Sequence, residues 1–115
     1  MNRTRIAEVL KSEALGSTFT VMGWVRTRRD SKGGFSFIEL NDGSCIRGLQ
    51  IIAESSLPNY EDEVKRLQTG CSIRVKGRLS PSPGKGQSVE LTAEEIEVFG
   101  WADPAHYPLQ KKRHS

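Results

Sequence analysis

The sequence predicts a small all-β domain in which five strands form a barrel, with one helix between the third and fourth strands. The 115 residues are enough to bury a single hydrophobic core. Alternating apolar and polar residues mark three strand-like runs, a helical pattern follows, and two more strand-like runs complete the chain. Each run is short and bounded by residues typical of turns.

The chain is expected to begin with a helical extension over residues 1–15. Thr4 is a candidate N-cap, and apolar residues after it recur at the spacing of one helix face. Gly16 ends this extension, and the first strand is expected over residues 18–29. Gly23 interrupts that strand, which predicts a bend made by a bulge or by close approach of another backbone.

The second strand is expected over residues 35–41. Its alternation directs Ile38 and Leu40 into the core and places Phe35 and Phe37 on the opposite face. An Asp-Gly pair then predicts a hairpin.

The third strand is expected over residues 45–53. If Ile38 packs against Leu49, antiparallel pairing requires Phe37 to share its face with Gly48 or Gln50. The alternation of side chains along the two paired strands therefore predicts that Gln50 lies beside an exposed phenylalanine.

A helix is expected over residues 57–68. Tyr60, Val64 and Leu67 recur at i, i+4 and i+7, acidic residues occupy its first turns, and Gly70 is suited to end it. This helix would pack its apolar face against the barrel.

Two more strands complete the pattern. The fourth is expected over residues 71–79, and a loop rich in serine, proline and glycine follows over residues 80–87. The fifth is expected over residues 89–99, with a bulge near Glu94 and Glu95. This order matches the five-stranded Greek-key barrel called the OB-fold. The expected organisation is a helical extension (1–15), the OB-fold domain (16–100) and a linker (101–115).

Composition narrows the classes of function. The net charge is only +3, but basic residues concentrate at residues 26–32 and 111–113. Local basic clusters favour contact with a short nucleic acid over the coating of a long duplex. No apolar run approaches the roughly 20 residues that cross a bilayer, and the amino end is too charged for a secretory signal. A cytoplasmic protein without membrane contact is therefore expected.

The cysteines and histidines do not form a metal-binding pattern. Cys45 and Cys71 make no Cys-x-x-Cys pair and are expected to be small buried residues in a reduced compartment. His106 and His114 lie in a polar tail without ligand-like spacing, so no metal site is predicted. No set of nucleophile, base and orienting group is evident, so no catalytic residue is predicted either.

OB-folds bind oligonucleotides on strands two and three, between the loops that join strands one to two and four to five. Exposed aromatics stack on unpaired bases, glutamine offers a donor and an acceptor to a base edge, and arginine binds phosphate or base. Glycines in the second loop let backbone approach the ligand. The candidate residues are Arg26, Arg28, Arg29, Phe35, Phe37 and Gln50 on the face and its edge, and Ser82, Pro83, Gly84, Lys85, Gly86 and Gln87 in the second loop.

Each face residue has a structural alternative. In the alternative interpretation, Phe37 lies in the core because a bulge shifts the register. In the same interpretation, Phe35 only covers the end of the barrel. Gln50 can be an ordinary exposed strand residue, and Arg26 and Arg28 can carry solvated charge. Alternation, loop placement and local charge select the same surface independently, which favours the binding interpretation.

Five segments resemble a known family: GWVRTRRDSK, FSFIELNDGSC, LPNYEDEVKRLQTGCSIRVKG, SPGKGQSVELTAEEIEV and YPLQKKRHS. They are similar to the N-terminal anticodon-binding domain of bacterial asparaginyl-tRNA synthetases. Aspartyl relatives share the GWV and RRD features, whereas NDGSC, LPNY, SPGKGQ and KKRHS are associated with the asparaginyl branch.

The resemblance implies an OB-fold that splays the anticodon bases over strands two and three. Phe37 would stack on the central uridine, Gln50 would read its edge, and Arg29 would support that contact. The loop at residues 82–87 would face the third anticodon base, and Glu90 the first.

The resemblance leaves one assignment open and implies a missing partner domain. Arg47 is the alternative to Gln50, because relatives differ in length across this turn. In the family a class II catalytic domain ligates asparagine to tRNA with ATP and magnesium. Nothing in this sequence supplies its ATP-binding arginines, so an excised domain that binds tRNA without a cofactor of its own is expected. The parent is expected to be a homodimer and the fragment a monomer.

Three other interpretations remain at this point. The first is an aspartyl-type anticodon-binding domain, and the second is a sequence-tolerant binder of single-stranded nucleic acid. The third is a protein-interaction module that docks a partner on Phe35, Phe37 and Ile52.

Overall fold

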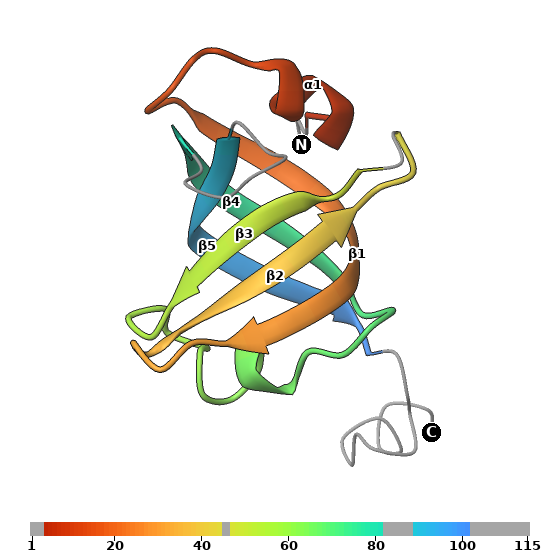
Figure 1. Cartoon of the computed structure of the whole chain (residues 1–115). Coiled ribbons are helices and arrows are strands. Elements are labelled where there is room, and N and C mark those ends of the chain that lie inside the picture. The colour runs from red at the N-terminus through yellow and green to blue at the C-terminus, as the bar shows by residue number, and fades with distance from the viewer. Residues whose placement is uncertain (1–3, 45–46, 82–88, 102–115) are drawn as a thin grey trace.

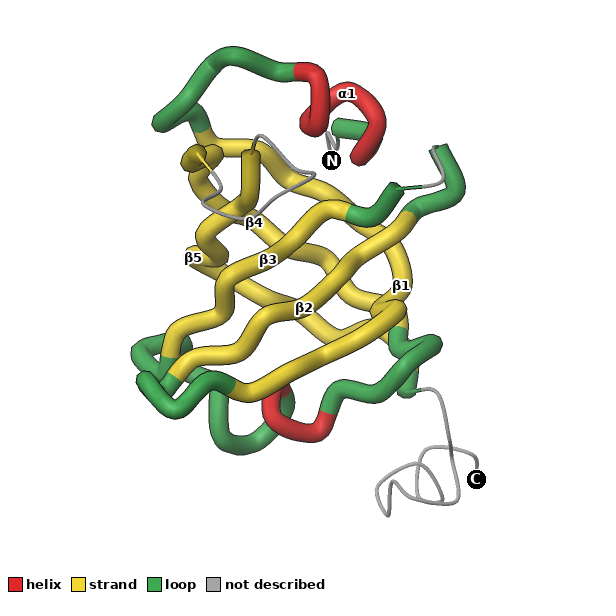
Figure 2. Tube along the Cα trace, in the orientation of Figure 1, coloured by secondary structure: helices red, strands yellow, loops and turns green. Residues whose placement is uncertain are grey.

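Five strands close into a barrel that has a short helix at one end and a 3-10 turn at the other (Figure 1, Figure 2). The structure is a computed structural model that describes residues 4–44, 47–81 and 89–101. The elements are α1 (Ile6–Lys11), β1 (Thr18–Asp30), β2 (Phe35–Asn41), β3 (Leu49–Glu54), the 3-10 turn η1 (Val64–Arg66), β4 (Ser72–Pro81) and β5 (Val89–Gly100).

The barrel closes because the two halves of β1 pair with different strands. Residues 18–24 pair with β4, and residues 24–30 pair with β2. β3 pairs with β2 in antiparallel fashion and with β5 in parallel, and β5 returns along β4. The order β1-β2-β3-β5-β4 confirms the predicted OB-fold.

Gly23 permits the bend of β1 through close backbone approach. A Cβ at this position would lie 2.3 Å from the carbonyl oxygen of Asn41, so only glycine fits without movement. The bulge of β1 lies at Arg26, where the register with β2 shifts. The bulge predicted for β5 is confirmed, because Glu94 is the extra residue opposite β4.

Alternation along the strands produces the core that the sequence predicted. Cys71 is buried as expected, whereas Cys45 lies outside the described residues. Trp101 packs against the core, whereas the Trp24 side chain lies on the outer face of β1 and is 43% exposed. Strand residues with no exposed surface include Val21, Val25, Ile38, Leu40, Ile51, Ile73, Val75 and Leu91.

The segment between β3 and β4 is not the helix expected over residues 57–68. Tyr60, Val64 and Leu67 are buried as their spacing predicted, but only η1 is helical. The N–H of Val64 donates to the carbonyl of Asn59, five residues back, rather than at the α-helical spacing. The Asn59 amide also donates to the carbonyl of Ile96 in β5, which ties these turns to the barrel.

The third strand begins later than expected, at Leu49 rather than at residue 45. The longer connection shifts the register by two residues, so Ile38 pairs with Ile51 instead of Leu49. A shift of two preserves the face of every side chain. Phe37 and Gln50 therefore still share one face, as predicted, although the direct partner of Phe37 is Ile52.

The connection between β2 and β3 caps helix α1. Thr4 is not the N-cap that the sequence predicted: Arg5 occupies that position and makes no side-chain capping bond. Instead, the N–H of Ile6 donates to Asp42 Oδ2 at 2.9 Å, and the N–H of Ala7 donates to Ser44 Oγ at 2.9 Å. The first two N–H donors of the helix are thereby satisfied from a distant loop.

This cap makes the packing of α1 sensitive to acid. Burial, the largest single influence, raises the pKa of Asp42, but hydrogen bonds from the Ser44 side chain and from the N–H groups of Ile6 and Ser44 together lower it below 3.8. Because the folded pKa is depressed, the ionised carboxylate stabilises the fold above the unfolded pKa. That stabilisation is lost as the pH falls through the folded pKa.

Replacement of the cap should therefore cost stability in a pH-dependent way. We expect Asp42→Ala to lower the free energy of unfolding by about 1 kcal/mol at pH 7 and by less at pH 3. Urea titrations at both pH values measure the difference. Glu13→Ala, which removes an exposed acid near α1, is the control. An equal loss at both pH values for Asp42→Ala would contradict a role for the ionised carboxylate.

Candidate nucleic-acid interface

Two rows of side chains cross the outer face formed by β1, β2, β3 and β5. The first row consists of consecutive register partners Arg29, Phe37, Ile52 and Thr92. The second row consists of register partners Thr27, Glu39 and Gln50, followed by Glu90, which Gln50 contacts. One row is aromatic and aliphatic with a basic end, and the other is polar.

The aromatic residues of β2 form a preassembled platform. The rings of Phe35 and Phe37 meet edge to face, with centroids 5.1 Å apart and an interplanar angle of 76°. The Arg29 guanidinium lies over the Phe37 ring, 5.2 Å from its centroid. Phe37 is half-buried on the outer face and is not a core residue. An aromatic pair with a positively charged group over one of its rings combines apolar surface with charge, which suits a nucleobase and its phosphate.

A hollow of about 170 Å³ opens where the two rows meet. Thr27 and Glu39 are not among the residues predicted for the site. Alternation along β2 nevertheless places Glu39 on the same face as Phe37. The lining residues are Thr27, Arg29, Phe37, Ile38, Glu39 and Gln50.

The amide of Gln50 is already hydrogen-bonded within the site. Its Nε2 donates to Glu90 Oε1 at 3.0 Å, which joins β3 to β5 across the polar row. Both side chains are half-buried. The structure thus brings together Phe37, Arg29 and Gln50 around the hollow, with Glu90 bonded to Gln50 at its edge.

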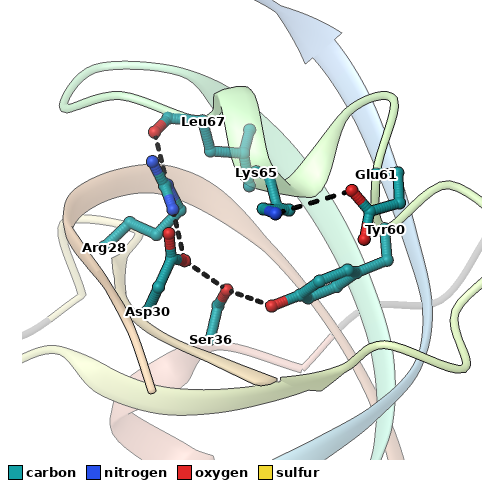
Figure 3. Close-up of polar contacts among 7 residues, drawn as sticks. All are labelled: Arg28, Asp30, Ser36, Tyr60, Glu61, Lys65 and Leu67. Atoms are coloured by element: carbon teal, nitrogen blue, oxygen red, sulfur yellow. Dashed lines mark hydrogen bonds and ion pairs between the residues drawn. The ribbon is translucent and has the colours of Figure 1, made fainter. Parts of the chain in front are cut away.

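Arg28 differs from its neighbour because its side chain is held inside the barrel end. Its Nε donates to the carbonyl of Leu67 at 2.9 Å, and its Nη1 donates to Asp30 Oδ1 (Figure 3). Ser36 Oγ donates to the same Asp30 oxygen at 2.7 Å and lies 3.0 Å from the Tyr60 hydroxyl. These contacts link β1 and β2 to the turns before β4.

This network favours the ionised form of Asp30. The hydrogen bond from Arg28, and then that from Ser36, lowers the pKa of Asp30 below 3.8. The carboxylate stays ionised at neutral pH and occupies one end of the guanidinium. Arg28 is therefore placed to support the position of β1 and β2 rather than to extend over the face.

The buried members of this network should be energetically coupled. We expect Ser36→Ala to lower the free energy of unfolding by about 1–3 kcal/mol, because the Tyr60 hydroxyl is left in a buried site without this partner. Adding Tyr60→Phe should recover part of the loss, since the hydroxyl is then absent. Denaturant unfolding of the single and double variants measures the coupling. Ser56→Ala, at an exposed turn, is the control, and strictly additive losses would contradict the network.

The remaining candidate residues lie around this centre. Arg26 is exposed at the bulge of β1, where its carbonyl accepts a hydrogen bond from Thr69 Oγ1. Arg47 is exposed before the start of β3, whereas Gln50 lies within that strand on the outer face that carries the two rows. Residues 80–81, predicted as loop, extend β4, and the loop candidates at 82–87 lie outside the described residues.

The described residues can be compared with the requirements of a metal site and of a membrane-spanning helix. Among the described residues, no group of three or more histidines, cysteines, aspartates or glutamates could hold a metal ion. Within the same ranges, no helix is both long and apolar enough to cross a membrane.

Several known proteins are similar to this chain in sequence. Residues 19–99 match the model of the OB-fold nucleic acid binding domain family. The chain is 59% identical over 113 residues to the asparagine--tRNA ligase of Desulfotalea psychrophila, covering 98% of this chain and 25% of that protein. It is 53% identical over 114 residues to the same enzyme of Syntrophobacter fumaroxidans, covering 97% of this chain and 24% of that protein.

Solved structures show the same fold. The crystal structure of asparaginyl-tRNA synthetase from Pyrococcus horikoshii, complexed with asparaginyl-adenylate, superimposes with a TM-score of 0.78 at 20% identity, covering all of this chain and 26% of that one. The chain spans about a quarter of the length of the curated relatives it matches. These relatives confirm the resemblance to asparaginyl-tRNA synthetases, and the chain belongs to the OB-fold nucleic acid binding domain family.

Proposed function

We propose that this chain recognises the anticodon loop of asparagine tRNA, whose anticodon is GUU. The observation that carries the proposal is the hollow in which Phe37, Arg29 and Gln50 meet. A base splayed from the loop stacks on Phe37, Gln50 hydrogen-bonds its edge, and Arg29 neutralises the adjacent phosphate. In this arrangement the central uridine is the base that enters the hollow.

The other candidates surround that central contact. Phe35 extends the platform, and Arg26 attracts phosphate at the bulge. Glu90, at the far end of the polar row, contacts the first base, and the loop at residues 82–87 faces the third. Arg47 approaches the loop from the start of β3, while Gln50 reads the central base.

The reaction itself belongs to the parent protein in this proposal. We infer that a larger enzyme, of which this chain corresponds to about a quarter, ligates asparagine to tRNA using ATP and magnesium in the cytoplasm. The parent acts as a homodimer, whereas the isolated domain is a monomer that binds RNA without a cofactor.

Binding of synthetic anticodon stem-loops tests the proposal. At fixed salt, a GUU loop should bind about 5- to 150-fold more tightly than a GCU loop, because loss of one matched base contact costs about 1–3 kcal/mol. With about four phosphates neutralised, the logarithm of affinity should fall with the logarithm of salt at a slope near −3. Equal affinity for both loops, or affinity that rises only with oligonucleotide length, would instead favour a sequence-tolerant single-strand binder.

A further inference from the structure

Strand topology places Gln50 and Glu90 side by side on the outer face. β3 and β5 pair in parallel, with Ile51 opposite Leu91 and Ile52 opposite Thr92. Gln50 precedes Ile51 and points outward. It therefore lies opposite Glu90, which precedes Leu91 in β5. The 3.0 Å hydrogen bond between Gln50 Nε2 and Glu90 Oε1 confirms this contact in the structure.

The chemistry of this pair fixes which way the amide points. A carboxylate only accepts hydrogen bonds, so it selects the amino end of the Gln50 amide. The carbonyl Oε1 is consequently at the end of the amide turned away from Glu90. An amide without such a partner can exchange its two ends by rotation about its last side-chain bond.

A second carboxylate borders Gln50 on β2 but is turned elsewhere. Glu39 is the register partner of Gln50. Its side chain packs over Gly48: a Cβ built on Gly48 would lie 2.6 Å from Glu39 Cγ and 2.8 Å from Glu39 Oε2. The absence of a side chain at Gly48 lets Glu39 adopt this position. Glu90 is thus the carboxylate that holds the Gln50 amino end.

We propose that Glu90 is a positioning residue that orients Gln50 to present a carbonyl acceptor to the central anticodon base. The inference rests on the proposed function and adds to it the origin of selectivity at that base. Uridine carries an N–H donor at N3, which matches the Gln50 carbonyl. Cytidine carries a lone pair at N3, which the carbonyl repels. The oriented amide therefore rejects cytidine by mismatch as well as favouring uridine by contact.

The test compares discrimination rather than affinity alone. Wild-type protein should bind the GUU stem-loop about tenfold or more tightly than the GCU loop, and a loop with N3-methyluridine at the centre should bind as poorly as GCU. Glu90→Ala should reduce the uridine-to-cytidine ratio to about threefold or less, because the amide can then present either end. Glu90→Gln should act similarly, since its own amide accepts and donates.

Matched controls separate orientation from other roles of Glu90. Glu54→Gln removes an exposed carboxylate on the outer face of β3 and should leave the uridine-to-cytidine ratio unchanged. Stem-loops with an abasic first position remove any direct contact of Glu90 with the first base, and the effect of Glu90→Ala on the ratio should persist with them. In a Gln50→Ala background, Glu90→Ala should no longer alter the ratio.

The outcomes distinguish this inference from the proposed function. If Glu90→Ala weakens binding of uridine and cytidine loops equally, or if its effect on the ratio disappears with abasic loops, the positioning role is overturned while anticodon recognition stands. If the wild-type protein binds both loops alike, the proposed function itself fails. A reduced ratio that requires Gln50 supports both.

Discussion

Phe37→Ala should weaken binding of a GUU anticodon stem-loop by about ten- to one-hundred-fold. Stacking of a base on an exposed aromatic contributes roughly 1–3 kcal/mol, and each 1.4 kcal/mol corresponds to a factor of ten. The substitution also removes the ring over which the Arg29 guanidinium lies, 5.2 Å from the centroid. Arg29, which binds phosphate in the proposed function, thereby loses its contact with that ring, so the effect should approach the upper end of the range.

The experiment needs a control for loss of an aromatic elsewhere on the surface. Phe99→Ala removes a phenylalanine that is 46% exposed on β5. This residue lies outside the two rows of side chains that form the proposed site, so binding of the stem-loop should be unchanged. Fluorescence anisotropy with labelled stem-loops measures affinity, and circular dichroism verifies that each variant is folded. A folded Phe37→Ala variant that binds GUU with wild-type affinity would remove the central element of the proposed site.

The faces of the strands could be predicted from sequence because alternation does not depend on register in detail. Ile38 and Leu40 had to point inward, which placed Phe37 on the opposite face with Gln50. The late start of β3 changed the register by two residues and left this relation intact. The bond of Gln50 to Glu90 depends instead on the parallel register of β3 with β5, which alternation does not specify, so this bond could not be predicted.

The roles of the adjacent arginines could not be predicted because a bulge intervenes. Simple alternation from Val25 would place Arg28 on the outer side and Arg29 toward the core. The extra residue at Arg26 reverses this parity, so that Arg28 pairs with Ile38 and Arg29 with the partner strand's outward Phe37. No local sequence signal specifies this bulge, since Arg26 is neither glycine nor flanked by one.

The helix expected before β4 shows a different limit. The i, i+4, i+7 spacing correctly identified Tyr60, Val64 and Leu67 as buried, because it reports which side chains can reach one surface. It did not determine the backbone that brings them there. The side chain of Asn59 donates to the carbonyl of Ile96, a tertiary contact that a local sequence pattern does not reveal.

Gly23→Ala should strongly destabilise the barrel. Its Cβ would lie 2.3 Å from the carbonyl oxygen and 2.9 Å from the carbonyl carbon of Asn41, so backbone rather than a flexible side chain must move. The overlap falls where β1 passes from pairing with β4 to pairing with β2. We expect a loss of about 3 kcal/mol and a melting temperature about 10–20 °C lower.

The displaced backbone also connects to the amino-terminal helix, which gives the prediction a second readout. Asn41 is followed by Asp42, whose carboxylate accepts the N–H of Ile6 at 2.9 Å. Movement of this backbone should loosen α1, so amide exchange at Ile6 should accelerate in Gly23→Ala at temperatures where the barrel remains folded. Gly100→Ala is the matched control, because its Cβ would meet only the Ser72 side chain at 3.4 Å or beyond. Equal melting temperatures for the two alanine variants would show that β1 and β2 can separate at this point without cost, contrary to the close approach seen here.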